Sequence, residues 1–320
     1  MRISHTNPRH ALTQLGRQIV LVTVFTVAVF ILWPQRQTLL DSFRALQHAT
    51  LSWVGLALVA TASTYVLATI AYALLVKHPV RWTQLWLVQA ATALTSRLAP
   101  IGIGTMGLTA WFLVRNKHSV ADALAVVTSN NAIGFLGHML LLAGMLQVAD
   151  LPTHSSFHLE PKIILIILVA AIVAAVVALI FDRLRVRLIR ALQAFGKALG
   201  GYRRTPGRLI RALVVSVALS LVYVSALGFC AQALHAPAAF STIFLIYTLS
   251  LFTGILTPTP GGLVGVEAGL VAGFVAYGYD ARTALSIAFL YRLATYWLPL
   301  VPGFIAFRMV QRLPAAKTKA

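Results

Sequence analysis

The stretch "LTPTPGGLVGVEAGL", residues 256–270, interrupts a long apolar part of the chain. Proline has no N–H to donate and ends a helix, and glycine permits a tight reversal of the backbone. The next helix is expected to begin near Leu263, and its N-terminus favours an anionic group. The stretch therefore predicts a broken helix whose backbone builds a polar pocket. The residues expected to form this break are Pro258, Pro260, Gly261, Gly262 and Gly265.

The rest of the chain is too apolar for a soluble protein. Of its 320 residues, 59% are hydrophobic and 10% are charged, whereas soluble domains have roughly 25% charged residues. The apolar runs are continuous and do not alternate with polar residues as in a membrane barrel. This composition predicts an all-α, polytopic helical membrane protein.

The chain is also strongly basic, with a formal net charge of +19. Its Lys and Arg residues lie mainly in the gaps between apolar runs, as anionic headgroups and the positive-inside rule require. We therefore expect membrane phospholipids as partners and no nucleic acid. The single cysteine, Cys230, excludes an internal disulfide and any multi-cysteine metal site.

A membrane span needs about 20 apolar residues. Two regions hold only shorter apolar pieces on either side of a break: 85–98 with 101–114, and 241–256 with 263–278. Each piece would reach only about 21–24 Å as a helix, so we expect two re-entrant hairpins. The six full-length spans are expected at 17–33, 51–76, 120–147, 163–181, 209–234 and 283–307.

The distribution of basic residues predicts the orientation of these elements. Residues 182–211 are rich in Arg, and the C-terminus is also basic. Both termini are therefore expected in the cytoplasm of a bacterium, with tails at 1–16 and 313–320 flanking one transmembrane domain, 17–312, in the inner membrane. The first span is read as uncleaved, because no small-x-small cleavage pattern follows it. These loop assignments are consistent with one another only if both ends of each hairpin lie on the same side of the membrane. The first hairpin would open from the cytoplasm and the second from the outside.

The two broken regions resemble one another. Pro100 lies 21 residues before Ala121, and Pro260 lies 21 residues before Ala281. Glycines follow each proline, Gly102 and Gly104 among them. A first repeat of about 51–147 and a second of about 209–307, joined by a basic amphipathic linker at 182–208, would form an inverted repeat, as in many transporters. The alternative is two unrelated loops rich in glycine and proline.

Three charged residues fall within the apolar regions. Glu267 follows the second break, Arg97 precedes the first, and Arg292 lies in the last span. An ionisable side chain inside the membrane must face a cavity, pair with a counter-ion or lose its charge. Arginine binds phosphate or carboxylate in a bidentate manner. These residues are therefore candidates for holding a lipid headgroup; the alternative is a Glu–Arg pair that only joins the two repeats.

Signals for enzymatic chemistry are weak. The sequence has no G-x-S-x-G, H-E-x-x-H or P-loop motif, so no catalytic residue, metal or cofactor is expected. His154 and His158 have no obvious third ligand. His138 is expected to be a hydrogen-bonded core histidine, and Asn130 and Asn131 are expected to bond across helices.

Two segments resemble a known family. "PTPGGLVGVEAGL" followed by "ALSIAFLYRLATYWLPLVPG", together with "SRLAPIGIGTMGLTAWFLVRN", resembles the transmembrane region of lysylphosphatidylglycerol synthases and its stand-alone, flippase-like bacterial relatives. The resemblance covers roughly residues 15–312. The positions that match the family's motifs are Arg97, Pro100, Pro258, Pro260, Gly261, Gly262, Gly265, Glu267, Tyr291, Arg292 and Gly303.

The resemblance implies a lipid translocase. In the full-length synthases a separate cytoplasmic domain makes the aminoacylated lipid, and no such domain is expected here, so the protein is not expected to be an enzyme. The expected substrate is an anionic or aminoacylated phospholipid, or a related envelope lipid, bound by Arg97, Glu267, Tyr291 and Arg292; the resemblance does not carry over which lipid moves. Two alternatives remain: an intramembrane lipid-modifying enzyme, and a non-transporting partner of a separate lipid-modifying enzyme.

Overall fold

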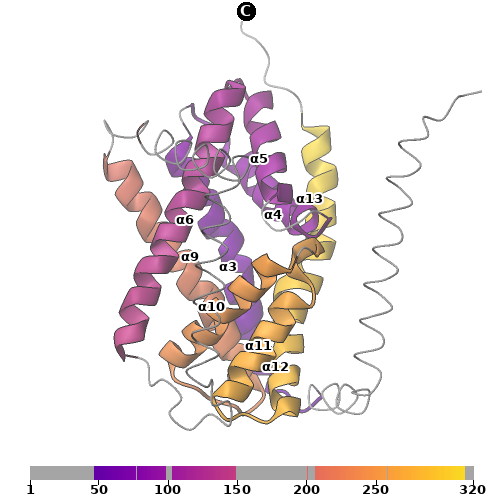
Figure 1. Cartoon of the computed structure of the whole chain (residues 1–320). Coiled ribbons are helices and arrows are strands. Elements are labelled where there is room, and N and C mark those ends of the chain that lie inside the picture. The colour runs from indigo at the N-terminus through magenta and orange to yellow at the C-terminus, as the bar shows by residue number, and fades with distance from the viewer. Residues whose placement is uncertain are drawn as a thin grey trace, which may run out of the picture.

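Four long apolar helices form the frame of the part of the protein that the structure describes (Figure 1). The computed structural model describes residues 47–76, 78–98, 103–148, 200, 206–257 and 259–313. None of these residues lies in a strand, and each long helix is apolar and long enough to cross a membrane. The expected all-α, polytopic membrane fold is thereby confirmed. The long helices are α3 (Leu51–Leu75), α6 (Val120–Val148), α9 (Pro206–Ala233) and the last span, Ala281–Arg312.

The last span is not a uniform α-helix. It consists of α12 (Ala281–Arg292), a π-helical turn η3 (Leu293–Trp297) and α13 (Leu300–Arg312). A span is expected here at 283–307 from the apolar run, but the sequence carries no signal for the π-helical turn. The spans expected at 17–33 and 163–181 lie outside the described residues, as do the two tails apart from Leu313 and nearly all of the linker at 182–208.

Two pairs of short helices complete the fold. Helices of 12 to 17 residues extend only about 18–26 Å, which is less than the hydrocarbon thickness of about 30 Å. The two members of each pair pack against one another as a helical hairpin. The first hairpin is α4 (Trp82–Leu98) with α5 (Ile103–Arg115), and the second is α10 (Phe240–Leu256) with α11 (Gly265–Ala276).

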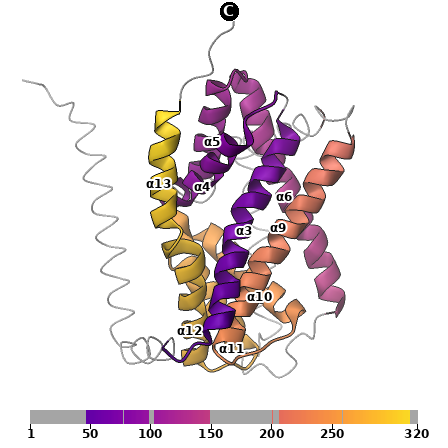
Figure 2. The same cartoon turned by 180° about the vertical axis from the view of Figure 1, so that it is seen from behind.

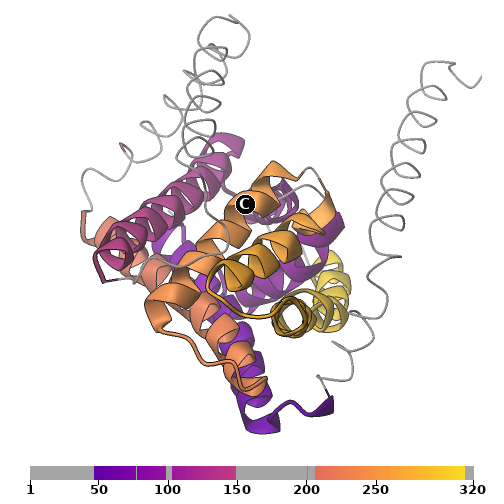
Figure 3. The same ribbon diagram turned by 60° about the horizontal axis from the view of Figure 1, so that its bottom comes forward.

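The hairpins open toward opposite ends of the helix bundle (Figures 1 and 2). The ring of His78, just before α4, lies 5.3 Å from the ring of His118, just after α5. The two chain ends of the first hairpin therefore meet, at the upper end of the bundle in Figure 1. At the lower end, the Tyr279 hydroxyl donates a hydrogen bond to the Pro237 carbonyl at 2.6 Å. This bond joins the segment before α10 to the segment after α11, which are the two chain ends of the second hairpin. Figure 3 brings this lower end forward, with the last span seen nearly along its axis.

The tips of the hairpins meet near the middle of the bundle. The chain reverses in the second hairpin through a short 3-10 turn, η2 (Pro260–Gly262), which contacts α4 of the first hairpin. Gly261 and Gly262 both have positive φ, 63° and 67°, a backbone conformation that glycine adopts readily. The following α-helix begins at Gly265, not at the expected Leu263, because this turn and Val264, with φ 73°, come first.

Glycines let the helices of the second hairpin approach closely. A Cβ atom on Gly269 would collide with Thr253 and the backbone of Ser250, and one on Gly273 would lie 2.9 Å from Ile246 Cγ2. Small residues at helix contacts are typical of membrane proteins. In lipid no hydrophobic force drives helices together, so close van der Waals packing has to hold them. A glycine also permits close packing between the last span and α4, where Gly303 lies against the backbone of α4.

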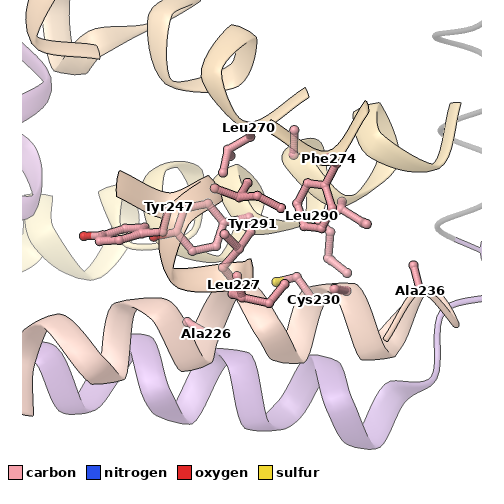
Figure 4. Packing of buried hydrophobic residues seen from close by; sticks show 14 of the residues in the cluster. Ala226, Leu227, Cys230, Ala236, Tyr247, Leu270, Phe274, Leu290 and Tyr291 are labelled. Atoms are coloured by element: carbon pink, nitrogen blue, oxygen red, sulfur yellow. The ribbon is translucent and has the colours of Figure 1, made fainter. Parts of the chain in front are cut away.

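A separate apolar cluster surrounds each hairpin. The lower cluster joins α9, α10, α11 and α12, with Leu227, Phe244, Leu270 and Phe274 fully buried (Figure 4 labels several of its members). The upper cluster joins the end of α3 to α4, α5, the start of α6 and the end of α13. Many large apolar side chains elsewhere on the bundle are exposed, as expected for surfaces that face lipid tails.

The order of elements is the same in both halves of the described chain. A long helix, a hairpin of two short helices and a second long helix occur in that order at 51–148 and again at 206–312. This order agrees with the predicted inverted repeat without establishing it. Whether the hairpins are re-entrant likewise stays a prediction.

Candidate functional site

A polar cavity of about 430 Å³ lies between the hairpin tips. Ligand sites are typically 300–1,000 Å³ in volume. Both arginines singled out in the sequence line this cavity, together with side chains from every described long helix. Its polar lining residues are Thr64, Tyr65, Tyr72, Gln89, Thr92, Ser96, Arg97, Thr105, Asn130, Asn131, Tyr223, Tyr247, Ser250, Tyr291, Arg292, Thr295 and Tyr296.

Arg292 and Glu267 form an ion pair beside the cavity. Arg292 Nε donates a hydrogen bond to Glu267 Oε1 at 2.6 Å, and the two side chains are 8% and 20% exposed. Arg292 ends α12, whereas Glu267 lies in the first turn of α11, where the helix dipole favours a carboxylate. Arg292 Nη2 also donates to the Gly261 carbonyl at 3.4 Å. The pair therefore joins the last span to the tip of the second hairpin.

Arg97 takes a different partner. Its Nη2 donates a hydrogen bond to the main-chain carbonyl of Thr295 at 2.5 Å, and its Nη1 donates to Ser96 Oγ at 2.8 Å. In an α-helix the Thr295 carbonyl would accept from residue 299. That residue is Pro299, which has no N–H. The proline therefore excludes the α-helical hydrogen bond to this carbonyl, which lies in the π-helical turn and accepts from the arginine of the first hairpin.

Tyr296 lies between the two arginines. Its ring centroid is 5.1 Å from Arg97 Cζ and 4.1 Å from Arg292 Cζ, distances at which a cation is attracted to an aromatic face. The ring also covers Gly261, where an added Cβ would lie only 2.6 Å from Tyr296 Cε2. One aromatic ring therefore packs against the tip of the second hairpin and contacts both cations.

Several buried polar atoms near the cavity have no hydrogen-bond partner among the described residues. They are Gln89 Nε2, Arg97 Nε and Glu267 Oε2. Buried polar groups are nearly always hydrogen-bonded to protein, water or ligand. Gln89 lines the cavity and is 1% exposed, so its amide is available to a bound group.

Two apolar grooves adjoin the polar cavity. One, of about 440 Å³, runs between α3, α4 and the last span, and shares Tyr65 with the cavity. The other, of about 260 Å³, runs between α6, α9 and α10. It shares four residues with the cavity: Leu219, Tyr223, Tyr247 and Leu251. The polar site therefore adjoins an apolar groove on each of two sides.

The structure brings together most of the residues singled out from the sequence. Arg97, Tyr291 and Arg292 line one cavity, and Glu267 binds Arg292 beside it. Arg97, the other expected partner of Glu267, does not pair with it. Gly104 and Gly265 sit at close helix contacts, against Thr95 and Thr257 respectively. Pro100, Gly102 and Pro258 lie outside the described residues.

Other residues of the site were missed from the sequence. Tyr296 and Thr295 were not identified, although Pro299, four residues after Thr295, indicates a free carbonyl there. Gln89 and the lining tyrosines other than Tyr291 gave no signal, because single residues of these types also occur in apolar helices that have no site. The expectation that His138 is a hydrogen-bonded core histidine agrees with the structure, in which its Nε2 lies 3.2 Å from Thr248 Oγ1. Among the described residues, no group of three His, Cys, Asp or Glu side chains could hold a metal ion.

The chain is similar to known membrane proteins. A UPF0104 membrane protein of Methanocaldococcus jannaschii is 21% identical over 127 residues, which is 39% of this chain and 38% of that protein. A UPF0104 membrane protein of Methanothermobacter thermautotrophicus is 33% identical over 67 residues, 21% of this chain and 20% of that protein. The chain thus matches well under half the length of either relative. The family model described as the lysylphosphatidylglycerol synthase TM region matches residues 18–303, and the chain therefore belongs to this family of multi-pass membrane proteins.

Proposed function

We propose that this protein moves an anionic phospholipid, or a related envelope lipid, between the two leaflets of the bacterial inner membrane. The observation that carries the proposal is the polar cavity with two arginines at the meeting point of two hairpins that open to opposite ends. A polar headgroup cannot cross about 30 Å of hydrocarbon unaided. A cavity at mid-depth supplies the hydrogen bonds that the headgroup would lose on leaving water.

The apolar grooves support the same proposal. A translocated lipid has to keep its acyl tails in an apolar environment while its headgroup lies in the polar cavity. Each groove adjoins the cavity through shared residues, Tyr65 on one side and four residues, Tyr223 among them, on the other. In the proposed mechanism the headgroup enters the cavity and the tails lie in a groove.

Charge distribution supports the predicted orientation. Apart from Arg97 and Arg292, the only described Lys or Arg outside the upper end is Arg282. By the positive-inside rule the upper end would face the cytoplasm. The first hairpin would then open to the cytoplasm and the second to the outside. The basic residues at the upper end are Arg81, Arg115, Lys117, Arg208, Arg211, Arg308 and Arg312.

The main rival is a lipid-modifying enzyme in which Glu267 acts as acid or base. Its Oε1 is engaged by Arg292 at 2.6 Å, and Glu267 is not among the residues that line the cavity. A general acid or base has to reach the reacting proton directly or through one water molecule. The observed geometry therefore favours a role for Glu267 as the counter-ion of Arg292.

Lipid exchange in proteoliposomes tests the proposal. Vesicles carrying a trace of headgroup-labelled phosphatidylglycerol are treated with dithionite, which destroys label only in the outer leaflet. The wild-type protein should increase the fraction of label destroyed, and the increase should be lost in Arg97→Ala and Arg292→Ala. Arg308→Ala is the matched control, because Arg308 is exposed on the same last span and lies outside the cavity.

Two results would contradict the proposal. One is the absence of exchange with anionic, zwitterionic and aminoacylated phospholipids alike, provided that thermal unfolding shows the protein to be folded. The other is a product of altered mass in the recovered lipids, which would favour the enzyme. If exchange occurs but Arg97→Ala and Arg292→Ala leave it unchanged, the path lies elsewhere in the protein.

A further inference from the structure

We propose that the cavity selects a lipid whose single phosphodiester charge is joined to an uncharged, polyhydroxylated headgroup. This inference rests on the proposed function and names its substrate class. It differs from what the family's name suggests, because an aminoacylated lipid carries cationic amino groups.

Every ionised side chain that lines the cavity is a cation. Arg97 and Arg292 line it, whereas the carboxylate of Glu267 lies off the lining and is held by Arg292. The other two acidic residues of the described chain are remote. Asp122 bonds to Ser119 at the upper end, and Asp280 begins α12 at the lower end.

These charges leave room for one anionic group. The charge of Arg292 is balanced by Glu267, so Arg97 is the cation without a carboxylate among the described residues. Its Nε is buried with no acceptor, and its Nη groups use neutral oxygens of Ser96 and Thr295. A phosphodiester oxygen would supply the missing acceptor and compensate the charge.

A cationic headgroup would meet repulsion in the same cavity. The carboxylate of Glu267 lies off the cavity lining, and Arg292 balances its charge through Oε1, although Oε2 has no partner among the described residues. Like charges within a few ångströms disfavour one another strongly in an environment of low dielectric constant. Tyrosine rings can also attract cations. However, Tyr296 already contacts both guanidinium groups, at 5.1 and 4.1 Å, so that ring is occupied.

The rest of the lining offers neutral hydrogen-bonding groups. Gln89, Asn130 and Asn131 carry amides that donate and accept, and the Nε2 of Gln89 is buried without a partner. Thr92 Oγ1 donates to the Gln89 carbonyl at 2.5 Å, so the Thr92 hydroxyl oxygen can still accept. Tyrosines add flat apolar walls with a polar tip. This combination fits several hydroxyl groups on a carbon skeleton.

Two classes of phospholipid have such a headgroup: those whose polyol is glycerol and those whose polyol is a ring such as inositol. The test therefore measures exchange of five labelled lipids in otherwise identical proteoliposomes: phosphatidylglycerol, phosphatidylinositol, phosphatidylethanolamine, phosphatidylcholine and lysylphosphatidylglycerol. The two polyol lipids should exchange about tenfold faster than the other three, a difference of ~1.4 kcal/mol. A preference between the two polyol lipids identifies the source.

The outcomes separate this inference from the function on which it rests. Equal rates for all five lipids, or fastest exchange of lysylphosphatidylglycerol, would overturn the selectivity and leave lipid translocation standing. No exchange of any lipid would overturn both. The labels are attached through an acyl chain and read with a membrane-impermeant quencher, so the headgroups remain native.

A variant with one added negative charge provides an independent test of the lipid selectivity. Gln89→Glu places a carboxylate in the cavity wall and should shift the preference toward lysylphosphatidylglycerol. Gln84→Glu is the matched control, because Gln84 lies in the first turn of the same helix and outside the cavity lining. An unchanged order of rates in a folded Gln89→Glu protein would count against the proposal. If that variant does not fold, the wild-type comparison of five lipids still decides.

Discussion

The guanidinium group of Arg97 donates a hydrogen bond to the main-chain carbonyl of Thr295 at 2.5 Å, although the two residues lie 198 positions apart. The contact links the first hairpin to the π-helical turn of the last span. Pro299, four residues after Thr295, cannot donate the α-helical hydrogen bond to that carbonyl. A helix defect in one half of the chain thus positions a cation from the other half at the cavity.

Replacing the proline tests this link. Pro299→Ala supplies an N–H that competes with Arg97 for the Thr295 carbonyl, and a hydrogen bond to a charged group contributes about 1.5–3 kcal/mol. We expect exchange of phosphatidylglycerol in proteoliposomes to slow several-fold. Pro302→Ala is the control, because the N–H that it supplies would face the Leu298 carbonyl in an α-helix, and Arg97 does not use that carbonyl. Equal rates in the two variants would show that the proline defect does not position Arg97.

The ion pair of Glu267 and Arg292 should be essential for stability. Removing one partner leaves a buried charge uncompensated, which costs about 3–5 kcal/mol in soluble proteins. Glu267→Gln and Arg292→Gln should each lower the unfolding temperature in detergent, and the double variant should recover part of the loss. A double-mutant cycle gives the coupling between them. Strictly additive losses would mean that the 2.6 Å contact contributes no coupling.

Gly261 should tolerate no side chain. Gly261→Ala would place a Cβ 2.6 Å from Tyr296 Cε2, at a residue whose φ is 63°. Gly278→Ala is the matched control, because Gly278 has φ 88° but open space around it. The control should cost ~1–2 kcal/mol for the left-handed conformation alone, and Gly261→Ala about 1–3 kcal/mol more for the clash. Chemical unfolding in mixed micelles measures both, and equal losses would contradict the proposed packing of Tyr296.

Cysteine accessibility tests the topology. In a protein in which Cys230 is replaced by Ser, cysteines at Val80 and Lys117 should react with a membrane-impermeant thiol reagent from the cytoplasmic side only. Cysteines at Ala239 and Ala281 should react from the outside only, because they lie at the lower end. Labelling of positions 80 and 117 from opposite sides would exclude a re-entrant first hairpin.

The start of α12 should be sensitive to acid. Asp280 Oδ1 accepts hydrogen bonds from the backbone N–H groups of Arg282 and Thr283, both at 3.0 Å. Hydrogen bonding, most of all from Thr283, holds the pKa of the Asp280 carboxyl below its usual range. A depressed pKa adds stability at pH values above the unfolded pKa of about 3.9, and this stability is lost as the pH falls through the lower folded pKa.

Variants of Asp280 give the measurement. Asp280→Ala should lower stability by ~1 kcal/mol near neutral pH, the usual cost of losing a helix cap. Asp280→Asn keeps a capping oxygen and should lose less, but should not show the wild-type decline below pH 4. Thermal unfolding in detergent between pH 3 and pH 7 follows both. A wild-type decline that persists unchanged in Asp280→Asn would assign the acid sensitivity to another group.

Much of the fold could be predicted from the chain itself. Long apolar runs determine spans, because water-free hydrocarbon leaves a backbone no alternative to internal hydrogen bonds. Prolines and glycines mark breaks, so the first hairpin was located from Pro100 and Gly104, and the second from Pro260 and Gly261. The family motifs around Glu267 and Arg292 are likewise local in sequence, and the family model matches there.

The site depended on contacts between distant residues. Nothing in the sequence decides whether Glu267 pairs with Arg97 or with Arg292, because both lie in apolar segments and have similar chemistry. The close packing of α11 on α10 and of the last span on α4 places Arg292 beside Glu267 and Tyr296 between the two arginines.

Sequence alone therefore determined that this protein is a helical membrane protein with two breaks and three charged residues in its apolar segments, because composition and helix-breaking residues act locally. Tertiary structure alone decided which charges pair, which carbonyl Arg97 reaches and which neutral side chains line the cavity. The physical reason is that these properties depend on distances of a few ångströms between helices, and helix packing sets those distances by the shapes of many side chains at once.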